Sequence, residues 1–160
     1  MGERGNRLNR LLDRYAGIPL AACSAAARLG KKSVPDVVPQ RVGFICLGAI
    51  GDLLLLSALI SALRERLPNV HVALLVSRAN AVTVSLIPGI DQYASFAVTD
   101  VSAMVAWLRE QRLDVLIDST QWARLGAILS NLSNARTTVG FDTEGQHRAF
   151  GYSLKVPHRN

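Results

Sequence analysis

From Arg41 onward, short apolar runs alternate with longer segments of mixed apolar and polar residues. The short runs predict five β-strands, at residues 42–47, 71–76, 93–98, 114–118 and 136–141. The longer segments predict helices at residues 52–67, about 79–87, 101–112 and 121–133. Alternation of this kind is typical of a parallel sheet that is covered on both faces. Because such crossovers are right-handed, we expect an α/β fold with a doubly wound, Rossmann-like sheet.

The first forty residues have a different pattern. Residues 7–16 predict an amphipathic helix, with leucines and a tyrosine on one face and arginines largely off it. Residues 17–19 (Gly-Ile-Pro) break that helix, and Pro19 can begin a second, alanine-rich helix that ends near Gly30. The stretch that follows carries two prolines and two lysines, as linkers often do.

The pattern therefore divides the chain into three parts. These are a helical extension (1–33), a linker (34–40) and a Rossmann-like domain (41–160). The last residues, 152–160, are not typical of the end of a domain, and we expect a polypeptide that continues beyond them.

Composition and charge narrow the class of protein. The chain has 160 residues, enough for one domain with a core, and 49% hydrophobic against 19% charged residues indicates a globular protein. Of the net charge of +6, most lies in residues 1–41, which hold eight Lys/Arg against three Asp/Glu. The arginine-rich extension is either an ordinary solvated surface or a contact with an anionic membrane, and the pattern favours neither. Nucleic acid is a poor candidate partner, because the basic cluster has few interleaved aromatic residues.

Several further classes of protein are not favoured. No stretch approaches the ~20 apolar residues of a membrane span, and the N-terminus lacks the features of a signal peptide. The cysteines, Cys23 and Cys46, predict two buried thiols in a reducing compartment. The three histidines are scattered without ligand spacing, so no metal site is expected.

The turn at residues 48–52 (Gly-Ala-Ile-Gly-Asp) is the most informative local feature. It joins the first predicted strand to a helix, at the sheet edge where ligands of such folds bind. The helix N-terminus there favours an anionic group, and Asp52 adds a carboxylate that can act as a base. An ordinary helix-start carboxylate, worth ~0.3–1 kcal/mol, explains Asp52 about equally well. The glycines fit neither the dinucleotide fingerprint nor the Walker loop, since Cys46 precedes Gly48 by two positions and Asp52 follows Gly51.

Other candidate positions follow the later strands, at residues 77–80, 118–124 and 140–145. Arg124 stands near a helix start, which suggests an acidic partner or an anionic ligand, although a solvated surface arginine is the more common case. Trp122 is either a packing residue, the more common role, or a platform for a sugar. Glu144 lies in a turn with another acidic residue, and that pattern alone indicates no function.

Three motifs resemble the amino-terminal half of the family 9 glycosyltransferases, the bacterial lipopolysaccharide heptosyltransferase type. They are RVGFICLGAIGDLLLLSALISALRERLPNVHVALLV from Arg41, RLDVLIDSTQWARLGAILSNLSNARTTVGFD from Arg112 and the weaker EGQHRAFGYSLKVP from Glu144. Together they cover about residues 41–157. The LLDRYAGIPL stretch before the linker also resembles extensions of some members.

The resemblance implies one half of a two-domain GT-B enzyme. Its first domain would bind a glycolipid acceptor of the lipopolysaccharide core type, and a second domain, absent here, would bind a nucleotide sugar such as ADP-heptose. The catalytic base would be Asp52, and acceptor or anion contacts would come from Gly48, Gly51, Arg124 and Glu144. No cofactor or metal is implied beyond the donor. We expect a truncated enzyme, inactive alone, located in the cytoplasm or peripherally on the cytoplasmic face of the inner membrane.

The sequence departs from the family at two positions of the site. Cys46 replaces a basic residue that is common before the turn, and Thr143 replaces an arginine that some members carry before Glu-Gly. A non-catalytic module that binds anionic glycolipid or a membrane surface, through the extension and the 48–52 turn, is the alternative function.

Overall fold

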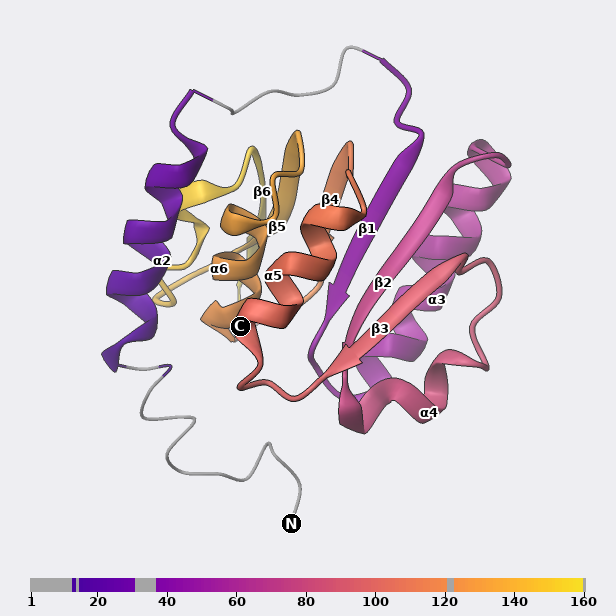
Figure 1. Cartoon of the computed structure of the whole chain (residues 1–160), viewed down its shortest axis with the longest axis horizontal. Coiled ribbons are helices and arrows are strands. Elements are labelled where there is room, and N and C mark those ends of the chain that lie inside the picture. The colour runs from indigo at the N-terminus through magenta and orange to yellow at the C-terminus, as the bar shows by residue number, and fades with distance from the viewer. Residues whose placement is uncertain (1–12, 14, 31–36, 121–122, 160) are drawn as a thin grey trace.

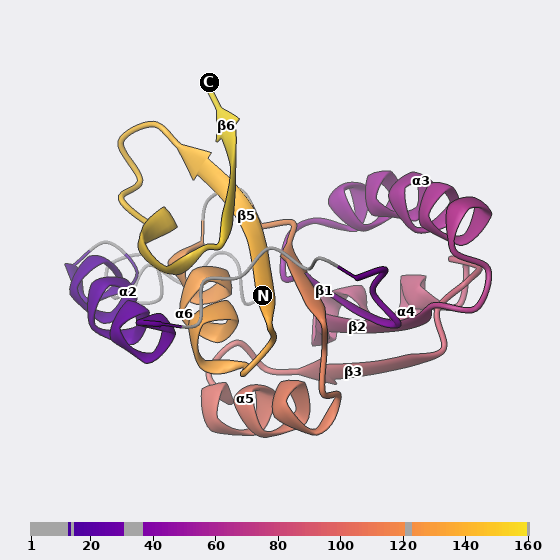
Figure 2. The ribbon, with the colours of Figure 1, turned by 90° about the horizontal axis from the view of Figure 1, so that it is seen from above.

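The computed structural model describes residues 13, 15–30, 37–120 and 123–159. Its elements form three layers, with one sheet between two layers of helices (Figure 1; Figure 2). The strands are β1 (Arg41–Cys46), β2 (His71–Ser77), β3 (Gln92–Phe96), β4 (Val115–Asp118), β5 (Thr137–Thr143) and β6 (Leu154–His158). The helices are α2 (Gly17–Ala25), α3 (Ile50–Arg66), α4 (Ala81–Val84), α5 (Val101–Glu110) and α6 (Arg124–Leu132).

The six strands are all parallel and follow the order β3-β2-β1-β4-β5-β6. The chain builds outward from β1 to β3, then returns to place β4 on the other side of β1. The carboxyl ends of β1 and β4 therefore flank the topological switch point, where α/β sheets of this kind bind ligands. The register sets Ile45 of β1 opposite Asp118 of β4. The doubly wound Rossmann-like fold predicted from the sequence is confirmed.

Alternate residues of the central strands enter two separate cores, as a period of two requires. Val42, Phe44 and Cys46 of β1 pack with β2 beneath α3 and α4. On the opposite face, Ile45 packs with Leu75 beneath α5 and α6. The two faces explain why the central strands are almost continuously apolar.

The sixth strand was not predicted. The sequence pattern predicts no strand after residue 141, but β6 lies at Leu154–His158 and pairs with β5 over its whole length. Leu154 and Val156 are both about two-fifths exposed, because β6 is an edge strand with no helix over it. Lysine and proline are common in strands at sheet edges, and with them β6 lacks the continuous apolar run that marks a central strand.

The helices differ from prediction mainly at their starts. α3 begins at Ile50, two residues early, because Ala49 is already extended and the Asp52 side chain caps its N–H group. The helix expected over residues 79–87 is reduced to a 3₁₀ turn (Arg78–Asn80) and the four-residue α4, followed by turns before Pro88. α6 begins at Arg124, and Trp122 lies outside the described residues.

The extension is packed onto the domain as far as it is described. α2 lies on the outer side of α6 (Figure 1), and the Asn131 side chain of α6 donates to Ala21 O and Ser24 Oγ. α2 begins at Gly17 and not at Pro19, because a proline in the first turn has no N–H bond to lose. Most of the predicted 7–16 helix lies outside the described residues.

Arg28, just after α2, connects the described part of the extension to the Rossmann-like domain. Its side chain is fully buried and donates to the carbonyl oxygens of Ala135 and Arg136 and to Ser153 Oγ. Burial lowers the pKa of this guanidinium. Cys46 is buried as expected, but Cys23 is exposed on α2, which corrects the prediction of two buried thiols. None of the helices in the described residues has the length and apolar character that crossing a membrane requires.

Candidate functional site

The turn after β1 holds Asp52 in a defined position. Ala49 is extended (φ −70°, ψ 162°), and its N–H group donates to Asp52 Oδ2 at 2.7 Å. A Cβ atom placed on Gly48 would lie only 2.2 Å from that oxygen, so the close approach of the carboxylate requires glycine there. Asp52 is partly exposed at the carboxyl end of β1, a central strand. The side chain is thus a helix cap, and its second oxygen, Oδ1, has no hydrogen bond to any of the described residues.

Gly51 has a different role from Gly48. It is exposed, and none of the described atoms lies within 4 Å of a Cβ placed on it. The protein's own packing therefore does not require glycine at this position. Cys46 points into the core beneath α3, and burial raises the pKa of its thiol.

Asn80, which follows β2, is hydrogen-bonded to the same turn. It is 1% exposed, and its Nδ2 donates to Gly48 O at 2.8 Å and to Cys46 O at 3.4 Å. The loop after β2 thereby fixes the loop after β1. The sequence marked residues 77–80 as a region of interest but did not single out this amide, because nothing in the local pattern shows that it is buried.

The end of β4 carries a buried polar cluster of Asp118, Thr120, Arg148 and Tyr152. Asp118 and Arg148 are buried and form an ion pair, and Tyr152 Oη donates to Asp118 Oδ2 at 2.5 Å. Arg148 also donates to Thr120 O at 2.6 Å and to Tyr152 Oη at 3.0 Å. The cluster joins the loop after β4 to the segment between β5 and β6.

Burial and the Asp118 charge together shift the pKa values of Tyr152 and Arg148. Burial, with the nearby Asp118 charge, raises the pKa of Tyr152 well above its ordinary value of 10.0. Burial alone would lower the pKa of Arg148, but the Asp118 carboxylate reverses the effect and the pKa is raised. At 1% exposure Asp118 is inaccessible to a ligand, so this carboxylate holds the loops in place.

Arg124 is not a solvated surface residue. Its side chain is 9% exposed, and Nη1 donates to Asp13 Oδ2 at 2.9 Å. The Arg124 backbone N–H donates to Asp13 Oδ1 at 2.9 Å, and Nε donates to Gln146 O at 2.9 Å. The acidic partner suggested by the sequence is therefore a carboxylate of the extension itself.

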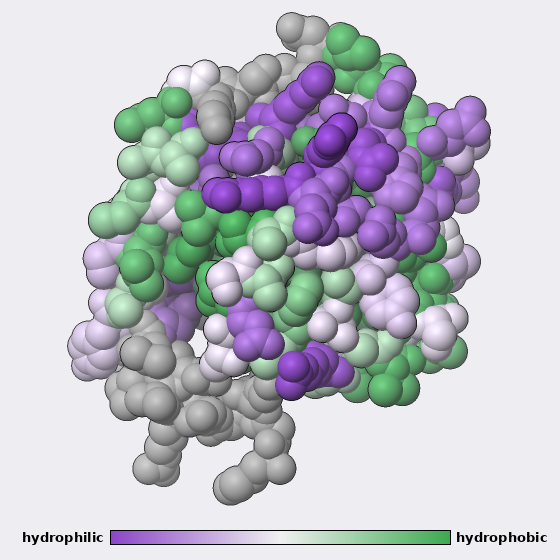
Figure 3. Space-filling model, viewed as in Figure 1, coloured by the Kyte–Doolittle hydropathy of each residue, from purple (hydrophilic) through white to green (hydrophobic). Residues whose placement is uncertain are grey.

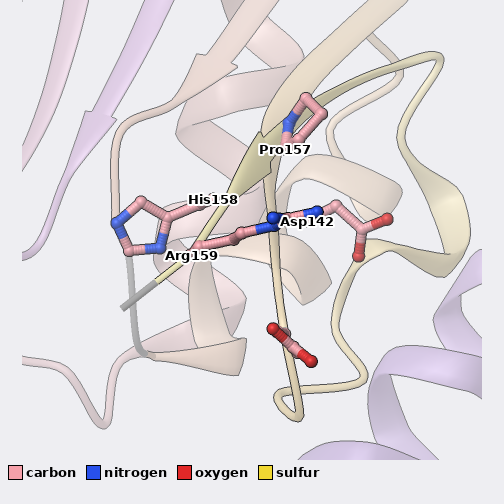
Figure 4. A pocket seen from close by; sticks show the side chains of 5 residues that line it. Asp142, Pro157, His158 and Arg159 are labelled. Atoms are coloured by element: carbon pink, nitrogen blue, oxygen red, sulfur yellow. The ribbon is translucent and has the colours of Figure 1, made fainter.

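Glu144 lines an open hollow of roughly 390 Å³ at the ends of β5 and β6. Asp142, Pro157, His158 and Arg159 form the rest of its wall (Figure 4). His158 Nδ1 lies 3.3 Å from Thr143 Oγ1, and its ring is 5.5 Å from that of Phe141. Thr143, which stands where some family members carry an arginine, is buried and does not line the hollow.

The sheet brings the predicted positions to one edge. The turn with Gly48 and Asp52 follows β1, Arg124 follows β4 and Glu144 follows β5, and these strands are neighbours. Adjacent strands are ~5 Å apart, so β1 and β5, with β4 between them, lie about 10 Å apart where they pair. Asp52 and Glu144 are accessible there, whereas Arg124 is already engaged.

A strongly hydrophilic surface lies elsewhere. In the view of Figure 3, hydrophilic residues gather in the upper part, at the amino ends of the strands and the end of α5. Exposed charged residues at that end are Arg109, Glu110, Arg112 and Arg136. The described residues contain no group of three His, Cys, Asp or Glu side chains able to hold a metal ion.

Comparison with known proteins gives structural matches alone. No family model matches the chain, and no curated protein matches it. Among solved structures, ADP-heptose lps heptosyltransferase II of E. coli is similar, with a TM-score of 0.62 and 16% identity over 72% of this chain and 34% of that one. A glycosyl transferase family 9 structure from Veillonella parvula DSM 2008 gives a TM-score of 0.60 and 18% identity, covering 73% of this chain and 35% of that one.

These neighbours agree with the resemblance seen in the sequence motifs. At such identities the match establishes a shared fold. This chain spans about a third of the length of each of the two proteins.

Proposed function

We propose that the chain is the acceptor-binding half of a family 9-type glycosyltransferase, with Asp52 as the catalytic base. The observation that carries the proposal is the position of Asp52, a partly exposed carboxylate beside the switch point of the sheet. The fold shared with two glycosyltransferases supports the same reading. The first of the three sequence motifs contains this turn and supports the proposal as well.

The geometry suits a proton acceptor. Asp52 Oδ2 is held by the Ala49 N–H group, which fixes the carboxylate and leaves Oδ1 to receive a proton from an acceptor hydroxyl. The hydroxyl oxygen then attacks the anomeric carbon of the donor sugar. The bond between that carbon and the nucleoside diphosphate breaks, the diphosphate leaves, and the configuration inverts. Asn80 keeps the turn rigid during this step by holding Gly48 O.

The substrates proposed are a nucleotide sugar and a glycolipid acceptor. A donor such as ADP-heptose follows from the name of one structural neighbour, and would bind to a second domain. The acceptor would be of the lipopolysaccharide core type, at the cytoplasmic face of the inner membrane. Gly51 and the Glu144 hollow would lie beside the acceptor, because both open at the same sheet edge.

Sugar transfer is the experiment that tests this function. The chain, joined to a nucleotide-sugar domain of a family 9 enzyme, is assayed with ADP-heptose and a lipopolysaccharide core acceptor. We expect transfer that is lost in Asp52→Asn and kept in Asp100→Asn, a control acid at the start of α5. Transfer by the Asp52→Asn fusion at the unchanged rate would remove Asp52 as the base.

A second candidate function, binding to an anionic lipid surface without catalysis, is favoured by the outer face of α3. Ile50, Leu54, Leu55 and Leu59 are each about half or more exposed there, next to Asp52. In the described part of the extension, Arg28 is buried and α2 packs on α6; the basic stretch that suggested a membrane contact lies mostly outside the described residues. Vesicle flotation that Leu55→Glu abolishes and Asp52→Asn leaves intact would favour this candidate.

A further inference from the structure

The guanidinium of Arg124 already holds a carboxylate. Asp13 places one oxygen on Nη1 and the other on the Arg124 backbone N–H, both at 2.9 Å, and its own carbonyl oxygen accepts from Nη1 at 3.1 Å. A carboxylate or phosphate ligand would use the same two kinds of donor. The sequence predicts Arg124 as an anion contact, and the structure fills that contact from within the chain.

The pair is built into the fold and is not a loose surface contact. The side chain of Arg124 is 9% exposed and that of Asp13 is 31% exposed. A Cβ atom on Gly17 would lie 2.8 Å from Arg124 Cδ, so glycine lets the first turn of α2 lie against the arginine. On its other side, Nε donates to Gln146 O, two residues beyond Glu144. Arg124 is thus clamped between the extension and the loop after β5.

We propose that Asp13 is an internal substitute for the acidic group of the acceptor, which must displace it to reach Arg124. This inference rests on the proposed function in that the displacing group belongs to an acceptor. Its chemistry is an oxyanion, either a phosphate or a sugar carboxylate. An acidic acceptor then binds at Arg124 only by displacing the Asp13 carboxylate, and a neutral molecule gains nothing there.

Competition by a tethered group has a predictable size. A carboxylate on the same chain acts at an effective concentration on the order of millimolar or higher. Where that concentration is about ten times the dissociation constant of the Asp13 contact, the contact weakens the binding of an anion from solution by about tenfold. Removing the charge of Asp13 should restore that factor, since Arg124 and its N–H group stay in place.

The test is a titration of the full chain with inorganic phosphate and, separately, with glucuronate. Asp13→Asn keeps an oxygen for the N–H group but loses the charge, and Asp13→Ser is a second variant with a capping hydroxyl. Ser24→Ala is the matched control, because it removes a bond between α2 and α6 without touching Arg124. Circular dichroism verifies that each variant is folded.

We expect Asp13→Asn to bind at least one of the two anions about tenfold more tightly than the original chain. The gain should be absent in Ser24→Ala and lost again in Asp13→Asn combined with Arg124→Gln. The anion with the larger gain identifies the acidic group. Equal affinities for Asp13→Asn, Asp13→Ser and the original chain, or an equal gain in Ser24→Ala, would overturn the proposal. The titration involves neither Asp52 nor a donor. The proposal about Asp13 can therefore fail while the transfer assay succeeds, and the transfer assay can fail while the proposal about Asp13 holds.

Discussion

The Asp52 carboxylate lies over Gly48, so closely that a Cβ atom at residue 48 would be 2.2 Å from Oδ2. The same oxygen accepts the Ala49 N–H bond that begins α3. Glycine at residue 48 is therefore required for the position of the Asp52 carboxylate, the proposed base. Gly51, three residues later in the same turn, has no such contact among the described atoms.

Replacing these two glycines with alanine should have opposite effects. Gly48→Ala must push the carboxylate away and break its bond to Ala49, which we expect to destabilise the fold by about 1–3 kcal/mol. Gly51→Ala, in the first turn of α3, should be neutral or stabilise by up to ~1 kcal/mol. Urea unfolding of both variants measures the difference, and equal destabilisation would contradict the described turn.

Asn80→Ala should destabilise the protein and loosen the Asp52 turn. It leaves the partly buried carbonyl of Gly48 and the buried carbonyl of Cys46 without their side-chain donor, at a cost of about 1–3 kcal/mol. Amide hydrogen exchange at Ala49 should accelerate, because the turn loses its brace. Ser57→Ala, which removes an exposed hydroxyl bonded to Leu54 O, should change neither quantity appreciably.

Tyr152→Phe should have an effect on stability that depends on pH. At neutral pH the variant loses the hydroxyl bonds to Asp118 and Arg148, so we expect a loss of about 1–2 kcal/mol. The pKa of Tyr152 is raised in the folded protein, so its stabilising contribution is complete below its ordinary value of 10.0 and declines as pH rises beyond it. Urea unfolding at pH 7 and above pH 10 should show that the difference in the free energy of unfolding between the two proteins becomes smaller at the higher pH. A difference in the free energy of unfolding that does not change with pH would contradict a raised pKa of Tyr152 in the folded protein.

Asp118→Asn should be more damaging than Tyr152→Phe. It leaves the buried Arg148 charge without its counter-ion, and breaking a buried pair of this kind costs about 3–5 kcal/mol. Arg136→Gln is a suitable control, since that arginine is exposed and lies 3.7 Å from Asp114. Thermal unfolding of the two variants measures the contrast; similar melting temperatures would contradict the burial of the Asp118 cluster.

Much of the fold was predictable because its central strands have strong, simple patterns. β1 and β2 are almost continuously apolar, and β1 is followed by the 17-residue helix α3. β6 escaped prediction because an exposed edge strand needs no apolar run, and its lysine and proline resemble a loop. The short α4 was overestimated because apolar residues continue past Val84 into turns, where Ile87 still enters the core.

The candidate site was predictable only in part. The turn with Gly48 and Asp52 is continuous in the sequence, so its local chemistry could be inferred. Contacts between distant residues could not: Asp13 with Arg124, and Asp118 with Arg148, are separated by 111 and 30 positions. No local pattern marks either pair, and both depend on how the strands are ordered.

The measurement that tests the account most directly compares transfer and acceptor binding in the Asp52→Asn fusion. A general base contributes about 10²–10⁴-fold to the rate and little to the affinity for the acceptor. We therefore predict that transfer falls by that factor while the acceptor dissociation constant stays within about twofold. Undiminished transfer, or a loss explained entirely by weaker acceptor binding, would contradict a catalytic Asp52.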